Sequence, residues 1–171
     1  MFKKIALLAV FTLIFSVSRA FATPLPVYEG SLDDFITAFN KTSAKTTGCF
    51  TLSTNPEFFD ETDGGIIYEI KSSPEIKDTE AMLVIDKNKQ VKNVVISANN
   101  RADIDKAFRT VLIVAGSTEK EINEVLPSYE ERVNTVGVAC ADKKRCFYVD
   151  TFVSQGHFVF VMTADSDFPV G

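Results

Sequence analysis

The segment Ala81-Met-Leu-Val-Ile-Asp-Lys-Asn-Lys-Gln-Val-Lys-Asn-Val-Val-Ile-Ser-Ala98 decides the fold class of this chain. Two apolar runs, 81–86 and 91–98, flank a polar stretch at 87–90, a pattern typical of a β-hairpin. The side chains that meet across the two predicted strands are Leu83 and Ile85 on one strand, and Val94 and Ile96 on the other. The hairpin therefore predicts antiparallel pairing in the middle of the chain.

A helix is predicted ahead of this hairpin, from Ser31 to about Ser43. Ser31 and Asp34 have the spacing of a capping box, which satisfies backbone N–H groups at the start of a helix. One apolar stripe follows at helical spacing, formed by Leu32, Phe35, Ile36 and Phe39. Gly48 breaks the helical pattern, and the alternation over 49–54 predicts a strand.

Two further helices are predicted after the hairpin. Asn100 caps the longer one, whose apolar side chains recur at helical spacing up to Gly116. Thr118 with Glu121 suggests a second capping box, which opens a short helix. Pro127 must interrupt or restart that helix, because proline lacks the N–H group that a helix interior needs.

The remaining strands are predicted at 66–70, 136–138, 147–149 and 157–162. Strands that cluster in runs between helices favour an α+β fold over a doubly wound parallel sheet. We therefore expect a single antiparallel sheet of about 6–7 strands, packed by the N-terminal helix and the central helix pair. The expected organisation is a signal peptide at 1–22, an extended lead-in at 23–30, a single α+β domain at 31–164 and a tail at 165–171.

The first 22 residues have the order of parts found in a cleavable signal peptide. Lys3 and Lys4 precede the apolar run Ile5–Phe15, and Ala20-Phe-Ala22 offers the small side chains that a signal peptidase accommodates. The alternative is a membrane anchor, but a helix of about 11 residues spans only ~17 Å of a ~30 Å hydrocarbon core. We therefore expect cleavage before Thr23 and a secreted or periplasmic protein that is not membrane-embedded afterwards.

The chain carries 18 basic and 23 acidic side chains, a formal net charge of −5. The predicted signal peptide contains Lys3, Lys4 and Arg19 and no acid, so 15 basic side chains remain after cleavage and the net charge becomes −8. An acidic surface repels phosphate backbones and anionic lipids. We therefore expect a protein or envelope component as partner and no nucleic acid, and we interpret the basic cluster 143–145 as a solvated turn.

Cys140 and Cys146 flank this charged turn, and a turn centred on Lys143 places them opposite each other. Because disulfides persist in exported proteins, we predict a structural disulfide between them, contributing about 2 kcal/mol through loop-closure entropy. Their spacing is not a metal signature, because no second Cys or His pair accompanies it. Cys49 is then the unpaired cysteine.

Cys49 and His157 are the remaining thiol–imidazole combination that could act as a nucleophile and base. A thiolate nucleophile needs a base within hydrogen-bond reach and a third group to orient that base. Nothing near either residue marks an oxyanion hole. We therefore interpret Cys49 as a small buried side chain and His157 as a residue at a strand edge, and we assign no catalytic residue and no cofactor.

Three acidic residues, Asp60 and Asp63 among them, are predicted to lie in an acidic loop at 60–65. Such a loop resembles a cation-binding segment, but an EF-hand needs an oxygen ligand at its fifth position and a Glu at its twelfth. Counting from Asp60, those positions hold Gly64 and Lys71. We therefore expect a solvated acidic turn, with a weak, irregular calcium site as the alternative.

The chain resembles small exported bacterial proteins of uncharacterised function. The resemblance covers most of residues 31–163 and rests on the motif S-L-x-x-F-x-x-x-F-N at 31–40, followed by strands, a central amphipathic helix and more strands. It implies a bacterial envelope setting and carries over no catalytic position.

Two function hypotheses follow from the sequence. The favoured one is a non-catalytic secreted or periplasmic binding or interaction domain, with a protein-inhibitor domain as a subcase, and it predicts a broad exposed apolar patch. The alternative is a small secreted hydrolase built on Cys49 or on an acidic pair. A hydrolase needs a cleft in which titratable groups converge.

Overall fold

The computed structural model describes residues 25–130, 137–140 and 146–164. The predicted signal peptide, the predicted tail 165–171 and the turn at Lys143 lie outside these residues. The helices are α2 (Leu32–Thr42), α3 (Arg101–Val114) and α4 (Glu119–Glu130), and a π-helical turn, η1, spans Ser43–Thr47. The strands are β1 (Thr51–Leu52), β2 (Glu57–Thr62), β3 (Gly65–Ser73), β4 (Glu80–Ile85), β5 (Val91–Ala98), β6 (Gly137–Cys140), β7 (Cys146–Ser154) and β8 (His157–Ala164).

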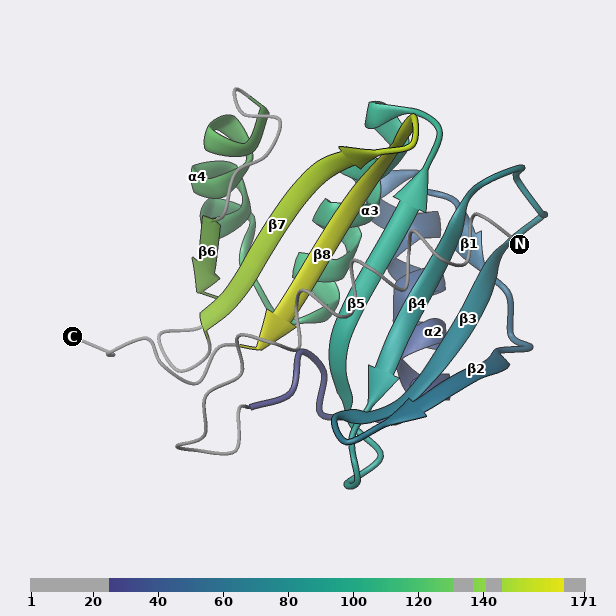
Figure 1. Ribbon diagram of the computed structural model, residues 1–171. Coiled ribbons are helices and arrows are strands. Elements are labelled where there is room, and N and C mark those ends of the chain that lie inside the picture. The colour runs from purple at the N-terminus through teal and green to yellow at the C-terminus, as the bar shows by residue number, and fades with distance from the viewer. Residues whose placement is uncertain (1–24, 131–136, 141–145, 165–171) are drawn as a thin grey trace.

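The strands form one sheet in the order β1-β3-β4-β5-β8-β7-β6, and β2 also pairs with β3 (Figure 1). Each of these pairings is antiparallel. The meander β3-β4-β5 comes first in the chain, and after α3 and α4 the chain returns through β6 and β7 to place β8 beside β5. The predicted α+β fold, with one antiparallel sheet, an N-terminal helix and a helix pair, is confirmed.

The predicted β4–β5 hairpin forms, but its cross-strand partners match the prediction only in part, because Ile96 pairs with Ala81. Leu83 pairs with Val94, while Ile85 pairs with Val91 through an irregularity in the register. Asp86 shapes the turn, because its carboxylate accepts hydrogen bonds from the backbone N–H groups of Asn88 at 2.8 Å and Gln90 at 2.9 Å.

Helix α2 begins at the predicted capping box. The Ser31 hydroxyl accepts a hydrogen bond from the Asp34 N–H at 3.2 Å, and the Asp34 carboxylate accepts one from the Ser31 N–H at 3.1 Å. The helical region ends at Gly48, which has the left-handed φ of 60° that glycine adopts without strain. The strand predicted at 49–54 is shorter than expected, because only Thr51 and Leu52 pair with β3.

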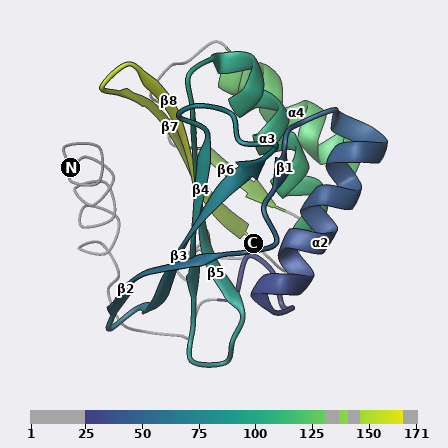
Figure 2. The ribbon, with the colours of Figure 1, turned by 90° about the vertical axis from the view of Figure 1, so that its right-hand side faces the viewer.

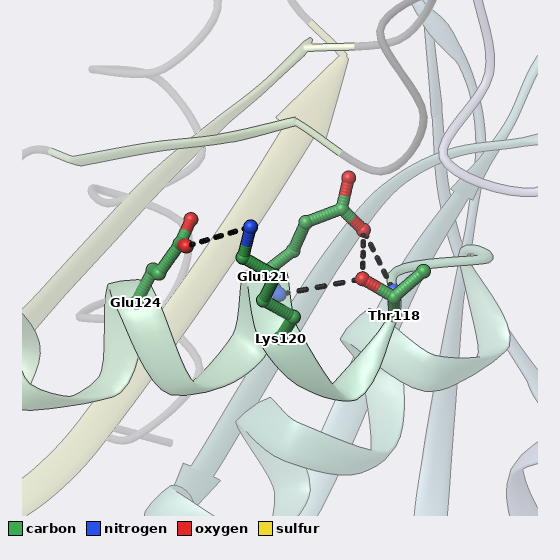
Figure 3. A network of polar contacts seen from close by, with 4 residues as sticks. All are labelled: Thr118, Lys120, Glu121 and Glu124. Atoms are coloured by element: carbon green, nitrogen blue, oxygen red, sulfur yellow. Dashed lines mark hydrogen bonds and ion pairs between the residues drawn. The ribbon is translucent and has the colours of Figure 1, made fainter.

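Helix α4 corrects one prediction. Its capping box is present, with the Thr118 N–H donating to the Glu121 carboxylate at 2.7 Å, and Lys120 and Glu124 form an ion pair at 3.8 Å on the next turn (Figure 3). The helix nevertheless runs through Pro127 to Glu130 and is not interrupted there. A proline removes one backbone hydrogen bond from a helix interior. The flanking turns keep their hydrogen bonds, so the helix can continue.

The acidic segment corrects a second prediction. Asp60 lies within strand β2, and only 63–64 separate β2 from β3, so the expected loop is a strand and a tight turn. The strands before the helix pair therefore number five, against the four that the sequence predicts. The alternation signal was absent because β2 is exposed along most of its length.

Helices α2, α3 and α4 lie on the same side of the sheet (Figure 2). Their apolar side chains and those of the sheet form a core in which five phenylalanines are fully buried. The rings of Phe108 on α3 and Phe160 on β8 meet edge to face with centroids 5.1 Å apart, which joins the helix layer to the sheet. These fully buried phenylalanines are Phe35, Phe39, Phe108, Phe147 and Phe160.

Among the described residues, no helix combines the length and the apolar character required to cross a lipid bilayer.

Candidate functional site

Cys49 follows Gly48 and is half-buried against the helix-side core. Its backbone N–H donates to the Thr47 hydroxyl at 3.4 Å, and that hydroxyl lies 2.7 Å from the Thr110 hydroxyl on α3. Burial raises the pKa of the Cys49 thiol to about 12. Because the thiolate is the reactive form, Cys49 is a poor nucleophile near neutral pH.

His157 lies on the opposite side of the sheet from Cys49. It is the first residue of β8 and pairs with Ser154 across the tight turn between β7 and β8. Alternation along β8 places His157 on the same face as Val159, whereas Phe158 packs against the helix-side core. The structure therefore does not bring the predicted thiol and imidazole together, and the sheet separates them.

Asp60 and Asp63 are both exposed. The Asp60 carboxylate accepts a hydrogen bond from the neighbouring Glu61 N–H at 2.8 Å, and Gly65 packs so tightly that an added Cβ would lie 2.1 Å from the Ile85 carbonyl oxygen. In the part of the chain that the structure describes, no group of three His, Cys, Asp or Glu side chains is arranged to hold a metal ion. The calcium alternative therefore gains no support from the geometry.

Cys140 and Cys146 lie directly opposite each other in the register of β6 and β7. Directly opposed residues of an antiparallel pair have Cα atoms about 4.5–5.5 Å apart, which suits a disulfide. The linking residues 141–145 and the two cysteine side chains lie outside what the structure describes, so the disulfide stays a prediction.

The face of the sheet opposite the helices, called here the helix-free face, carries a second apolar cluster. No described helix lies on this side of the sheet (Figure 2). The six side chains of the cluster are only 0–2% exposed in the full chain. They are Ile67, Met82, Val84, Val95, Val159 and Val161, with the partly buried Phe59 and Phe152 packed against them.

Strand register makes this cluster continuous. Val95 on β5 pairs with Met82 on β4 on one side and with Val161 on β8 on the other. Ile67 on β3 pairs with Val84 on β4, which extends the cluster to a fourth strand. With strands about 4.8 Å apart, the cluster is roughly 15–20 Å wide.

Polar groups border the cluster on both sides. At one end, the Thr163 hydroxyl donates to the Asn93 side-chain oxygen at 2.6 Å. On β7, Asp150 pairs with Val161, and burial raises the pKa of its carboxyl group. On β3, Glu69 pairs with Met82.

Sequence reasoning missed the helix-free face, although a signal for it exists. Strands covered on both faces have continuous apolar runs, whereas strands with one wet face alternate. The runs 81–85, 94–96 and 158–162 are continuous. They predict two apolar faces, whereas the predicted hairpin contacts account only for the half of each run that faces the helices.

A comparison of the chain with protein-family models finds no match, and comparisons with curated proteins and with solved structures find none either. The function must therefore be argued from the residues themselves.

Proposed function

We propose that this protein is a non-catalytic binding domain that works outside the cytoplasm, and that the helix-free face is its binding surface. The observation that carries the proposal is the second apolar cluster, which lies on a sheet face that no described helix covers. These side chains are 0–2% exposed in the full chain, so the proposal requires that the mature protein expose them. Contiguous apolar area with a polar border is typical of interaction sites when it is exposed.

The apolar centre and polar border of the surface support binding of a macromolecule or a chain segment. Small-molecule sites are usually concave, whereas protein interfaces have an apolar centre and a polar rim. Val95 on β5 lies at the centre of the cluster. Glu69 on β3 and Asp150 on β7 lie two strands away from Val95, one on each side. This is the arrangement of an interface centre and its rim.

The state of Cys49 supports a non-catalytic function. A thiol with a pKa of about 12, on the other side of the sheet from the chain's single histidine, has neither a low-pKa thiolate nor a base. The hydrolase alternative would therefore have to rest on an acidic pair, and no described observation selects one.

A photo-crosslinking experiment tests the binding surface. A photoreactive phenylalanine analogue replaces Phe152, which packs against the cluster, in protein produced by a secreting bacterial host. The matched control carries it at Val153, the next residue along β7, which faces the other way and is 48% exposed. We expect a discrete adduct from position 152 that position 153 does not form. Equal adducts from both positions, or none from position 152, would contradict the proposal.

The export part of the proposal has its own measurement. Intact mass and N-terminal sequencing of the secreted protein should place its first residue at or near Thr23. Thiol counting should find Cys140 and Cys146 bonded. Met1 retained on membrane-embedded material would overturn the export argument.

A further inference from the structure

We infer that the helix-free face accepts an apolar segment with basic flanks, and that in the uncleaved chain its occupant is residues 3–19 of the same chain. The inference rests on the proposed function only in its choice of surface. It adds the occupant and a consequence of processing: cleavage before Thr23 removes the occupant and opens the face to an outside partner.

The burial of the cluster favours a covering segment. The six cluster side chains are 0–2% exposed in the full chain, and the described helices all lie on the other side of the sheet (Figure 2). Removing aliphatic side chains on a sheet face from water lowers the free energy, so this face favours a covering segment that is itself apolar. The run Ile5–Phe15 is the longest such segment outside the described residues.

The charges around the cluster are complementary to those of residues 1–22. Among the described residues, acidic side chains outnumber basic ones around the cluster on its own face of the sheet, where Lys71 lies 3.7 Å from the Glu57 carboxylate. The acidic residues that the register of β2, β3, β4 and β7 places there include Glu57, Asp60, Glu69, Glu80 and Asp150. Residues 1–22 contain three basic side chains and no acid. An acidic rim around an apolar centre is complementary to an apolar segment with basic flanks.

The length of the linking chain is compatible with this occupant. The described chain begins at Leu25, and Tyr28 pairs with Val91 at the start of β5, one of the strands that carry the cluster. The ten residues from Phe15 to Leu25 span up to roughly 33 Å when extended. That length exceeds the width of the cluster, so the linking chain is long enough to span it.

A second copy of the chain is a poorer occupant. Face-to-face pairing would bring two acidic rims together, and each chain without residues 1–22 has a net charge of −8. Like charges facing one another across an interface oppose association. The segment 3–19 has the opposite charge and is already tethered, which raises its effective concentration.

The test uses the full-length, uncleaved chain with the same photoreactive analogue at Phe152 and, as control, at Val153. Trypsin cleaves after Lys4 and Arg19, so the apolar part of the proposed occupant is released as one peptide, 5–19, whose adduct is identified by mass spectrometry. We expect the adduct within one chain, from position 152 only. An adduct between chains would assign the face to a second copy, and absence of peptide 5–19 from the adducts would also overturn the inference.

Charge reversal at two half-buried rim positions adds a second readout. Glu69→Lys with Asp150→Lys should reduce the yield of the 5–19 adduct severalfold, and added salt should reduce it in the unmodified chain. The matched control, Asp33→Lys with Glu119→Lys, makes the same change of charge at exposed positions on helices α2 and α4, on the other side of the sheet, and should leave the yield unchanged. Equal yields from the two double variants would refute the charge argument and, with it, the inference.

The two proposals fail in different ways. If position 152 of the secreted protein captures a partner while the uncleaved chain gives no 5–19 adduct, the binding surface stands and the intramolecular occupant is wrong. If neither protein gives an adduct from position 152, both proposals are wrong.

Discussion

Cys49 shows how burial controls the chemistry of one side chain. Because burial raises the pKa of its thiol to about 12, the reactive thiolate is scarce at pH 8. We expect Cys49 in the native protein to react with iodoacetamide far more slowly than a free thiol, and to react at the normal rate once urea unfolds the chain. Rapid native alkylation would show that the thiol is activated and would revive the hydrolase hypothesis.

Asp150 is a residue whose burial opposes stability at neutral pH. Burial raises the pKa of its carboxyl group, so the folded state binds this proton more tightly than the unfolded state does. The ionised carboxylate therefore lowers the free energy of unfolding above the folded-state pKa, and this cost disappears as the pH falls below the unfolded value of about 3.9. Asp150→Asn should raise the urea midpoint at pH 7, with a gain that shrinks on acidification. A gain independent of pH would assign the effect to packing.

At the scale of elements, α4 depends on its cap. Thr118 and Glu121 exchange hydrogen bonds at the helix start, and these bonds lower the pKa of the Glu121 carboxyl group (Figure 3). Thr118→Ala should lower the free energy of unfolding by about 1 kcal/mol, measured by urea denaturation. Thr37→Ala, an exposed change inside α2, is the matched control and should cost nothing, because alanine is the better helix former. Equal losses in both variants would contradict the capping explanation.

The β2–β3 hairpin is the element that tests metal binding. Asp60 and Asp63 are exposed and solvated, so we expect 1 mM calcium to leave the Tm nearly unchanged. Stabilisation by a ligand grows as RT ln(1 + [L]/Kd), so a gain of about 2.7 kcal/mol would imply a Kd near 10 μM. Such a gain, lost in the variant Asp60→Asn with Asp63→Asn, would establish a calcium site.

At the scale of the whole molecule, the helix layer and the sheet are joined through aromatic packing. Phe108 and Phe160 are both fully buried and meet edge to face. Phe108→Ala should lower the free energy of unfolding by about 3–5 kcal/mol, a large share of the roughly 5–15 kcal/mol that stabilises a typical domain. Phe58→Ala, at a side chain that is 65% exposed, should change it by less than about 0.5 kcal/mol. Thermal and urea unfolding measure both values.

Local signals predicted most of the elements. The capping residues Ser31, Asn100 and Thr118 each start a helix where expected, because a cap is a contact between residues three positions apart. The hairpin register around Leu83 was also predictable, because alternation and a short polar turn are both visible locally. Strand β2 was missed, because its edge position leaves it exposed and its pairing depends on β3.

The candidate site could be predicted only in part. Cys49 and His157 were visible as reactive residue types, but their separation by the sheet depends on contacts between segments about a hundred residues apart in the sequence. The apolar runs 81–85 and 158–162 contain side chains of both faces of the sheet. Which of these side chains face the helices depends on where α2 and α3 pack.

The sequence by itself determined the order of the described helices and of the strands other than β2, the capping residues and the acidic charge, because these depend on side-chain chemistry within a few positions. The tertiary structure alone decided that β8 inserts beside β5, that all described helices gather on one side, and that Val95 and its neighbours form a continuous second face. The physical reason is that burial depends on the whole fold. Contact with any apolar neighbour lowers the free energy of an apolar side chain, and only the packed sheet determines which neighbour it contacts.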